Sequence, residues 1–113
     1  MAVYNLRIDV RYNRFCLGKT VLEAMGNPEF VQLWIRPSDL AIMVQGVSYG
    51  LRVVVTASGE FYICSKKLMM KLRYASNNAI KDGSYRIPGE ISKDSGVAVF
   101  PMSQMVRLGN KAE

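Results

Sequence analysis

The chain has 113 residues, half of them hydrophobic, and a formal net charge of +6. This apolar content suits one compact domain over residues 1–113 and excludes a disordered chain. No apolar stretch approaches the roughly 20 residues of a membrane span, and the first residues lack the apolar region and cleavage site of a signal peptide. We therefore expect no membrane association and a cytoplasmic location.

The first half of the chain reads as a strand, a turn, a short strand, a small helix and a hairpin. Residues 5–12 alternate between apolar and polar side chains, as half-buried strands do. Gly26 stands where a glycine often follows a helix, and Pro28 prevents the helix from continuing. In chain order the predicted elements are a strand at 5–12, a turn at 13–14, a strand at 15–17, a helix at 20–25, a strand at 31–35, a turn at 37–39 and a strand at 40–44.

The second half predicts the same order of elements after a linker at 46–50. Ser65 is a plausible N-cap for the second helix, because its hydroxyl can accept a bond from the first helical turn. The predicted elements are strands at 51–56, 60–64, 85–87 and 97–100, turns at 58–59 and 88–96, a helix at 66–74, a polar loop at 75–84, an edge strand at 103–108 and a flexible tail at 109–113.

The two halves also share a weak sequence repeat. Residues 6–10 return as 51–55, an offset of 45, and residues 15–25 return as 62–72, an offset of 47. Order, spacing and residue class agree, although two unrelated hairpin-helix units could align by chance. The repeat predicts an α+β, mainly β fold, built from two pseudo-symmetric strand-helix-hairpin units at 5–44 and 51–100.

The repeat predicts specific core residues and cysteine positions. The apolar stripes of the two helices place Leu22, Met25, Met69 and Leu72 in the core. Cys16 and Cys64 fall one register position apart on equivalent strands. We therefore expect them on opposite faces of the sheet, as buried reduced thiols without a disulfide.

The chain contains no histidine, so the commonest general base and the commonest metal ligand are both absent. Two lone cysteines do not form the spacing of a zinc site. The Ser65-Lys66 pair could be a nucleophile with its base, but an N-cap beside a solvated lysine explains it more simply. We therefore expect that the protein is not an enzyme and that it has no catalytic residue, no metal and no cofactor.

The positive charge is concentrated in the second half. Residues 1–48 have five basic and four acidic side chains, whereas residues 49–113 have ten and five. Between residues 61 and 81 there are five basic side chains and no acidic one. Such asymmetry is typical of proteins that bind polyanions, nucleic acid above all, although a solvated helix face that aids solubility explains it equally well.

Residues 14–18 and the Met25-Gly26 pair support a family resemblance. They occupy the places of an arginine turn, a short strand ending in Ile-Pro, and a helix ending in Leu-Gly. In this respect the chain resembles the AbrB/MazE-like swapped-hairpin domains, which are small DNA-binding regulators of prokaryotes, phages and antitoxins. It departs from them at Gly18 and Ser65, where the family has proline. The resemblance implies that exchanged hairpins close a small barrel, here within one chain, and that basic side chains contact DNA.

Two functions remain open at this point. The first is a transcription regulator or antitoxin-like protein that binds double-stranded DNA, with Tyr62 and Tyr74 stacking on bases if the target is single-stranded. Its candidate nucleic-acid-binding residues are Arg7, Arg11, Arg14, Arg52, Lys66, Lys67, Lys71 and Arg73. The second is a phage or mobile-element accessory protein that binds a protein partner or a second copy of itself. Met70, Met102 and Met105 would then mark that surface, unless they simply pack in the core.

Overall fold

The structure is a computed structural model that describes residues 4–77, 79–92 and 94–108. The predicted tail at 109–113 lies outside the described residues. In chain order the elements are β1 (Tyr4–Asp9), η1 (Val10–Tyr12, a 3-10 helix), β2 (Arg14–Leu17), α1 (Lys19–Ala24), β3 (Phe30–Arg36), β4 (Ala41–Val47), β5 (Leu51–Arg52), β6 (Val54–Val55), β7 (Phe61–Cys64), α2 (Lys66–Ala75), β8 (Ser84–Ile91), β9 (Val97–Pro101), η2 (Met102–Gln104, also 3-10) and β10 (Val106–Arg107).

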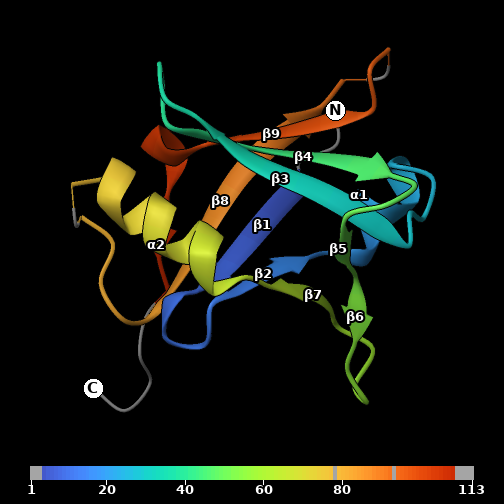
Figure 1. Ribbon diagram of the computed structural model, residues 1–113, viewed down its shortest axis with the longest axis horizontal. Coiled ribbons are helices and arrows are strands. Elements are labelled where there is room, and N and C mark those ends of the chain that lie inside the picture. Colours follow the sequence, from blue (N-terminus) through green and yellow to red (C-terminus); the bar gives the residue numbers. More distant parts are fainter. Residues whose placement is uncertain (1–3, 78, 93, 109–113) are drawn as a thin grey trace.

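The strands form one antiparallel sheet that curls into a nearly closed barrel (Figure 1). Its order is β5-β3-β4-β9-β8-β1-β2-β7-β6, with β10 beside β8. The two ends of this order, β5 and β6, are separated in the chain by Val53 alone. Leu51 pairs with Val31, and Val54 pairs with Tyr62. One short stretch of chain therefore reaches both ends of the sheet.

Each half of the chain pairs extensively with the other. The β3–β4 hairpin pairs with β5 and β9, both from the second half. Likewise β1 pairs with β8, and β2 pairs with β7. The central strands are therefore held by contacts between residues far apart in the sequence.

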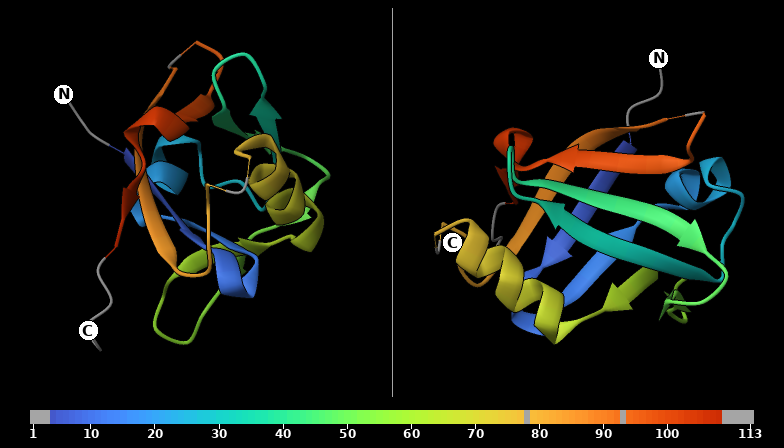
Figure 2. Two further views of the ribbon diagram at one scale, coloured as in Figure 1. Left: turned by 90° about the vertical axis from the view of Figure 1, so that its left-hand side faces the viewer. Right: turned by 45° about the horizontal axis from the view of Figure 1, so that its top comes forward.

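The two helices lie at opposite ends of the barrel (Figure 2). Val21 and Leu22 of α1 are buried, as are Met69 and Leu72 of α2, so each helix contributes to the core. Met25 is half-buried against the same core. Three of the four predicted helix core residues are thus confirmed as buried. Among the described residues, no helix has the length and apolar character needed to cross a membrane.

The helix ends also follow the sequence prediction. The Ser65 hydroxyl accepts a hydrogen bond from the backbone N–H of Leu68 at 3.2 Å, which confirms it as the N-cap of α2. Gly26 follows α1 with a φ of +85°, a conformation that glycine adopts at low cost. These local signals set both helices within one residue of the predicted bounds.

The first strand is shorter than predicted. The extended chain ends at Asp9, and residues 10–12 form η1. The Val10 N–H donates to Gly83 O at 2.9 Å, and Asn13 turns the chain with a φ of +56°. Tyr12 therefore lies on the surface with 59% of its area exposed, instead of pointing into the core as alternation predicts.

The second half differs from prediction in three strands. The predicted strand at 51–56 is interrupted at Val53, whose N–H donates to Glu29 O at 3.0 Å. The strand predicted at 85–87 extends into the expected turn at 88–96 as far as Ile91, because its first part pairs with β1 and its last part with β9. The edge strand expected at 103–108 is reduced to the two residues of β10, after the 3-10 turn η2.

Candidate nucleic-acid interface

Register aligns polar side chains in two rows across the outer face of the barrel. The inward positions of β1 and β2 are filled by Leu6, Ile8, Phe15 and Leu17, so the residues between them face outward. The first row crosses four strands through Arg86, Arg7, Cys16 and Tyr62. The second row runs beside it through Ser84, Asp9, Arg14 and Cys64.

Arg7 is held in a network of acidic and thiol groups. Its Nη2 lies 3.3 Å from Asp9 Oδ2, 3.2 Å from Glu60 Oε2 and 3.4 Å from Cys16 Sγ. Asp9 also accepts a hydrogen bond of 2.6 Å from the Ser84 hydroxyl. The two carboxylates compensate the charge of Arg7, which makes it a weaker phosphate ligand than its outward position alone predicts.

The positions of the two cysteines differ from the sequence prediction. Cys16 and Cys64 lie on the same outer face, because β2 and β7 pair with Cys16 opposite Tyr62 and Cys64 opposite Arg14. Both thiols are free; Cys64 is exposed and Cys16 is half-buried. Burial raises the pKa of the Cys16 thiol to about 11, with Asp9 adding to the shift and Arg7 opposing it. The predicted opposite facing is wrong, because register across the two halves cannot be derived from the repeat offset. The predicted burial is wrong for Cys64 and is met only in part by Cys16.

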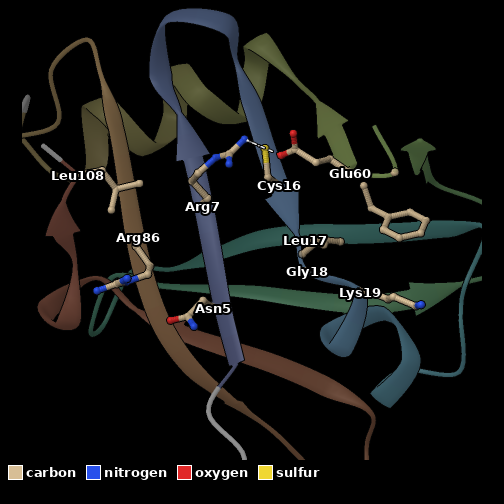
Figure 3. A pocket seen from close by; sticks show the side chains of 11 residues that line it. Asn5, Arg7, Cys16, Leu17, Gly18, Lys19, Glu60, Arg86 and Leu108 are labelled. Carbon is tan, nitrogen blue, oxygen red and sulfur yellow. Dashed lines mark hydrogen bonds and ion pairs between the residues drawn. The ribbon is translucent and has the colours of Figure 1, made fainter. Parts of the chain in front are cut away.

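A pocket of about 340 Å³ opens beside the first row of side chains (Figure 3). Figure 3 shows Arg7 leaning toward Cys16 and Glu60, while Arg86 extends from β8 on the other side of β1. The charged residues lining the pocket are Arg7, Lys19, Arg86 and Glu60. Three cations against one carboxylate give the lining a net positive charge.

Arg14 contacts two tyrosine rings. Its guanidinium carbon lies 4.6 Å from the centroid of the Tyr62 ring and 5.6 Å from that of Tyr12. The Arg11 guanidinium lies 5.8 Å from the Tyr12 ring as well. Cation–π attraction at these distances holds both rings beside positive charge.

This arginine-tyrosine cluster adjoins the start of α2. The Ser65 N–H donates to Asn13 O at 2.9 Å, and the Cys64 thiol lies 3.7 Å from Tyr12 O. Figure 1 shows the η1 loop below the first turn of α2. Lys66 and Lys67, both exposed, therefore lie next to the cluster.

The outer face of α2 begins beside this cluster, at the Ser65–Asn13 bond. Lys67, Met70, Lys71 and Tyr74 are spaced three or four residues apart, opposite the buried Met69 and Leu72. All four outer residues are exposed, Met70 by 61% and Tyr74 by 87%. We call the combined area the η1–α2 surface; it consists of Arg11, Tyr12, Arg14, Lys66, Lys67, Met70, Lys71 and Tyr74.

The structure groups five of the eight predicted cations and separates three. Arg11, Arg14, Lys66, Lys67 and Lys71 belong to the η1–α2 surface. Arg7 belongs to its acidic network, and Arg73 lies 3.8 Å from Asp82. Arg52 lies in β5 beside β3, 3.3 Å from Glu29. Arg7 and Arg52, which the repeat makes equivalent, therefore belong to separate ion-pair clusters.

Sequence reasoning missed Tyr12 and Arg86. Alternation along the first strand predicts that Tyr12 faces the core, and only the predicted turn at 13–14 indicates a surface position. Arg86 enters the face through the pairing of β8 with β1, for which the local sequence holds no signal.

The methionines and possible metal ligands complete the survey. Met102 is buried and Met105 is half-buried against the core, so only Met70 is exposed among the three methionines considered for a protein partner. Over residues 4–77, 79–92 and 94–108, no group of three or more acidic or cysteine side chains is placed to hold a metal ion.

We compared the chain with models of protein families, with curated proteins and with solved structures, and no match was found.

Proposed function

We propose that this protein is a nucleic-acid-binding regulator, with DNA as its polyanion and the η1–α2 surface as its binding face. The supporting observation is that five cations gather there while η1 and α2 contain no acidic side chain. We place it in the cytoplasm, the compartment in which free thiols such as Cys16 and Cys64 persist.

Phosphate attraction would supply most of the affinity. Lys66, Lys67 and Lys71 are flexible point charges that can follow a phosphate backbone. Binding that neutralises phosphates releases counterions, so affinity falls steeply as salt rises. Arg14 already contacts two rings, which leaves the lysines as the main phosphate ligands.

We also propose that the halves are tandem swapped-hairpin units related by a pseudo-twofold axis, as in the AbrB/MazE-like regulators. The strand pairs support this, because exchanging the halves reproduces every pair except β10–β8, with β1 matched to β5 and β6 together. The pair β1–β2 corresponds to β6–β7, β1–β8 to β5–β3, and β3–β4 to β8–β9. The pairs β2–β7 and β4–β9 correspond to themselves.

A salt titration with duplex DNA tests the proposed function. If all five cations of the surface contact phosphates, the slope of log K against log salt is about −4.5, and the three lysines account for most of it. Replacing Lys66, Lys67 and Lys71 with Gln should reduce the magnitude of that slope by about 2.7. The matched control replaces Lys19, Arg36 and Arg52 with Gln, which changes the net charge equally but lies elsewhere, and should leave the slope nearly unchanged. Equal loss in both variants would mean that only net charge attracts DNA.

The alternative function is a protein-interaction module. Its support is the exposed Met70 on α2, beside the still more exposed Tyr74. Such a surface would bind a protein partner with little salt dependence. A parent protein that fails to bind nucleic acid at low salt would favour this alternative.

A further inference from the structure

The η1–α2 surface exposes more aromatic area than phosphate binding requires. Tyr12 is 59% exposed and Tyr74 is 87% exposed, with Met70 between cations on the same helix face. Phosphate contacts need donors and positive charge, to which a bare ring face contributes nothing. Rings interleaved with cations are instead typical of surfaces on which unpaired bases stack.

The Tyr12 ring is already positioned for such a contact. Arg14 lies against both Tyr62 and Tyr12, and Arg11 lies near Tyr12 as well. The Cys64 thiol also approaches the backbone of Tyr12. A ring restrained in this way loses little conformational freedom when a base stacks on it.

The spacing along α2 suits more than one nucleotide. Ser65, which is bonded to Asn13 beside Tyr12, lies nine residues before Tyr74. At 1.5 Å per residue the helix rises roughly 14 Å over that stretch. Along the helix, Lys67 and Lys71 come between Ser65 and Tyr74, on the same helix face as Tyr74. The order along the surface is thus ring, cation, cation, ring.

We propose that the η1–α2 surface binds single-stranded nucleic acid in preference to duplex, with Tyr12 and Tyr74 stacking on bases and Lys67 and Lys71 contacting the phosphates between them. In a duplex the base faces are covered by their neighbours, so these rings would find no partner. This inference rests on the proposed function and specifies its substrate class.

A third exposed tyrosine supplies the control. Tyr49 is 90% exposed, but its ring pairs with Phe30 at a centroid distance of 6.5 Å near β3, away from η1 and α2. Replacing Tyr49 with Leu removes the same chemical group from a different surface. All three tyrosines are on the outside, so none of the replacements should disturb the core.

The test measures fluorescence anisotropy of a labelled 12-nucleotide single strand and of its duplex at one low salt concentration. We expect the parent to bind the single strand at least tenfold more tightly than it binds the duplex. Tyr12→Leu and Tyr74→Leu should each weaken single-strand binding about tenfold and change duplex binding less than twofold. Tyr49→Leu should bind both like the parent, and thermal unfolding confirms that each variant is folded.

The outcomes separate the two proposals. Tighter duplex binding, or Tyr12→Leu and Tyr74→Leu variants that bind the single strand like the parent, would overturn the single-strand preference and leave nucleic-acid binding intact. A loss of the same size in Tyr49→Leu would also overturn it. Failure to bind either probe at low salt would overturn the proposed function itself. Should Tyr12→Leu fail to fold, Tyr74→Leu alone decides the question.

Discussion

Cys16 and Cys64 share the outer face of the sheet but have different surroundings. Cys64 is exposed beside Tyr12, whereas Cys16 is half-buried between Arg7 and Asp9, with its thiol directed at the Asp9 carboxylate. Burial favours the neutral thiol, and that preference links the protonation of one side chain to folding.

The raised pKa of Cys16 predicts a loss of stability at alkaline pH. The pKa rises from 9.0 to about 11 on folding, so between these values the unfolded chain releases a proton that the folded chain retains. The Cys16 contribution is complete below pH 9 and is lost as pH rises toward 11. Urea unfolding of the parent should therefore show a steeper decline in the free energy of unfolding from pH 8.5 to 10.5 than Cys16→Ser. Cys64→Ser is the control and should decline like the parent; equal slopes in all three would refute the assignment.

Gly89 predicts a steric effect at a close approach of two strands. A Cβ added there would overlap Val99 O and lie 2.6 Å from Phe100 Cδ1. Because β9 and the core residue Phe100 have little room to move, Gly89→Ala should cost about 1–3 kcal/mol in the free energy of unfolding. In Gly18→Ala the nearest contact is 3.8 Å, so that variant should lose less than about 1 kcal/mol. Urea unfolding of both variants checks the difference, and similar losses would count against it.

At the scale of elements, each helix contributes a buried apolar face to one end of the barrel. Leu22 and Leu72 are almost completely buried. Leu22→Ala and Leu72→Ala should each lower the free energy of unfolding by about 2–5 kcal/mol, through lost burial and the cavity left behind. Met70→Ala, on the outer face of α2, should cost far less. Chemical denaturation measures all three, and an unchanged midpoint for either leucine variant would mean that its helix does not pack as described.

The elements differ in how well the local sequence predicts them. Both helices were predicted within one residue, because Ser65, Gly26 and the apolar stripes are local signals. The end of β1 at Asp9 depends on the bond from Val10 to Gly83, 73 positions along the chain. The length of β8 depends on β1 and β9 in the same way. Such pairings between distant residues set strand bounds that no local pattern encodes.

The candidate site could be predicted only in part, because it also depends on pairings between residues far apart in the sequence. The run of positive charge between residues 61 and 81 indicates the lysines of α2, whereas Arg11 and Arg14 follow from the alternating strand and the family resemblance. The arginines and the lysines come near one another because a backbone hydrogen bond from Ser65 to Asn13 joins the start of α2 to the turn after η1. The contact of Arg14 with Tyr62 depends on the β2–β7 register. The compensation of Arg7 by Glu60, which is 53 positions away, also comes from tertiary structure.

At the scale of the whole molecule, the exchange of strands predicts that neither half folds alone. Residues 1–48 contain β3 and β4 but lack their partners β5 and β9. A fragment of 48 residues can also bury only a marginal amount of surface by itself. Separate fragments 1–48 and 49–113 should show no cooperative thermal transition by circular dichroism, while an equimolar mixture should regain one. A cooperative, monomeric transition in either isolated fragment would contradict the described pairing.

The short stretch from β5 to β6 also sets where the barrel opens first. On either side of Val53, β5 pairs with β3 and β6 pairs with β7 over only two positions each, whereas β1 and β8 pair over six positions. Local opening requires least free energy where the fewest bonds must break together. Amide hydrogens of Arg52 and Val55 should exchange with deuterated solvent well before those of Leu6 and Ile8. The barrel would then open locally between β5 and β6, while β8 and β1 on the opposite side stay paired and their amide hydrogens exchange slowly.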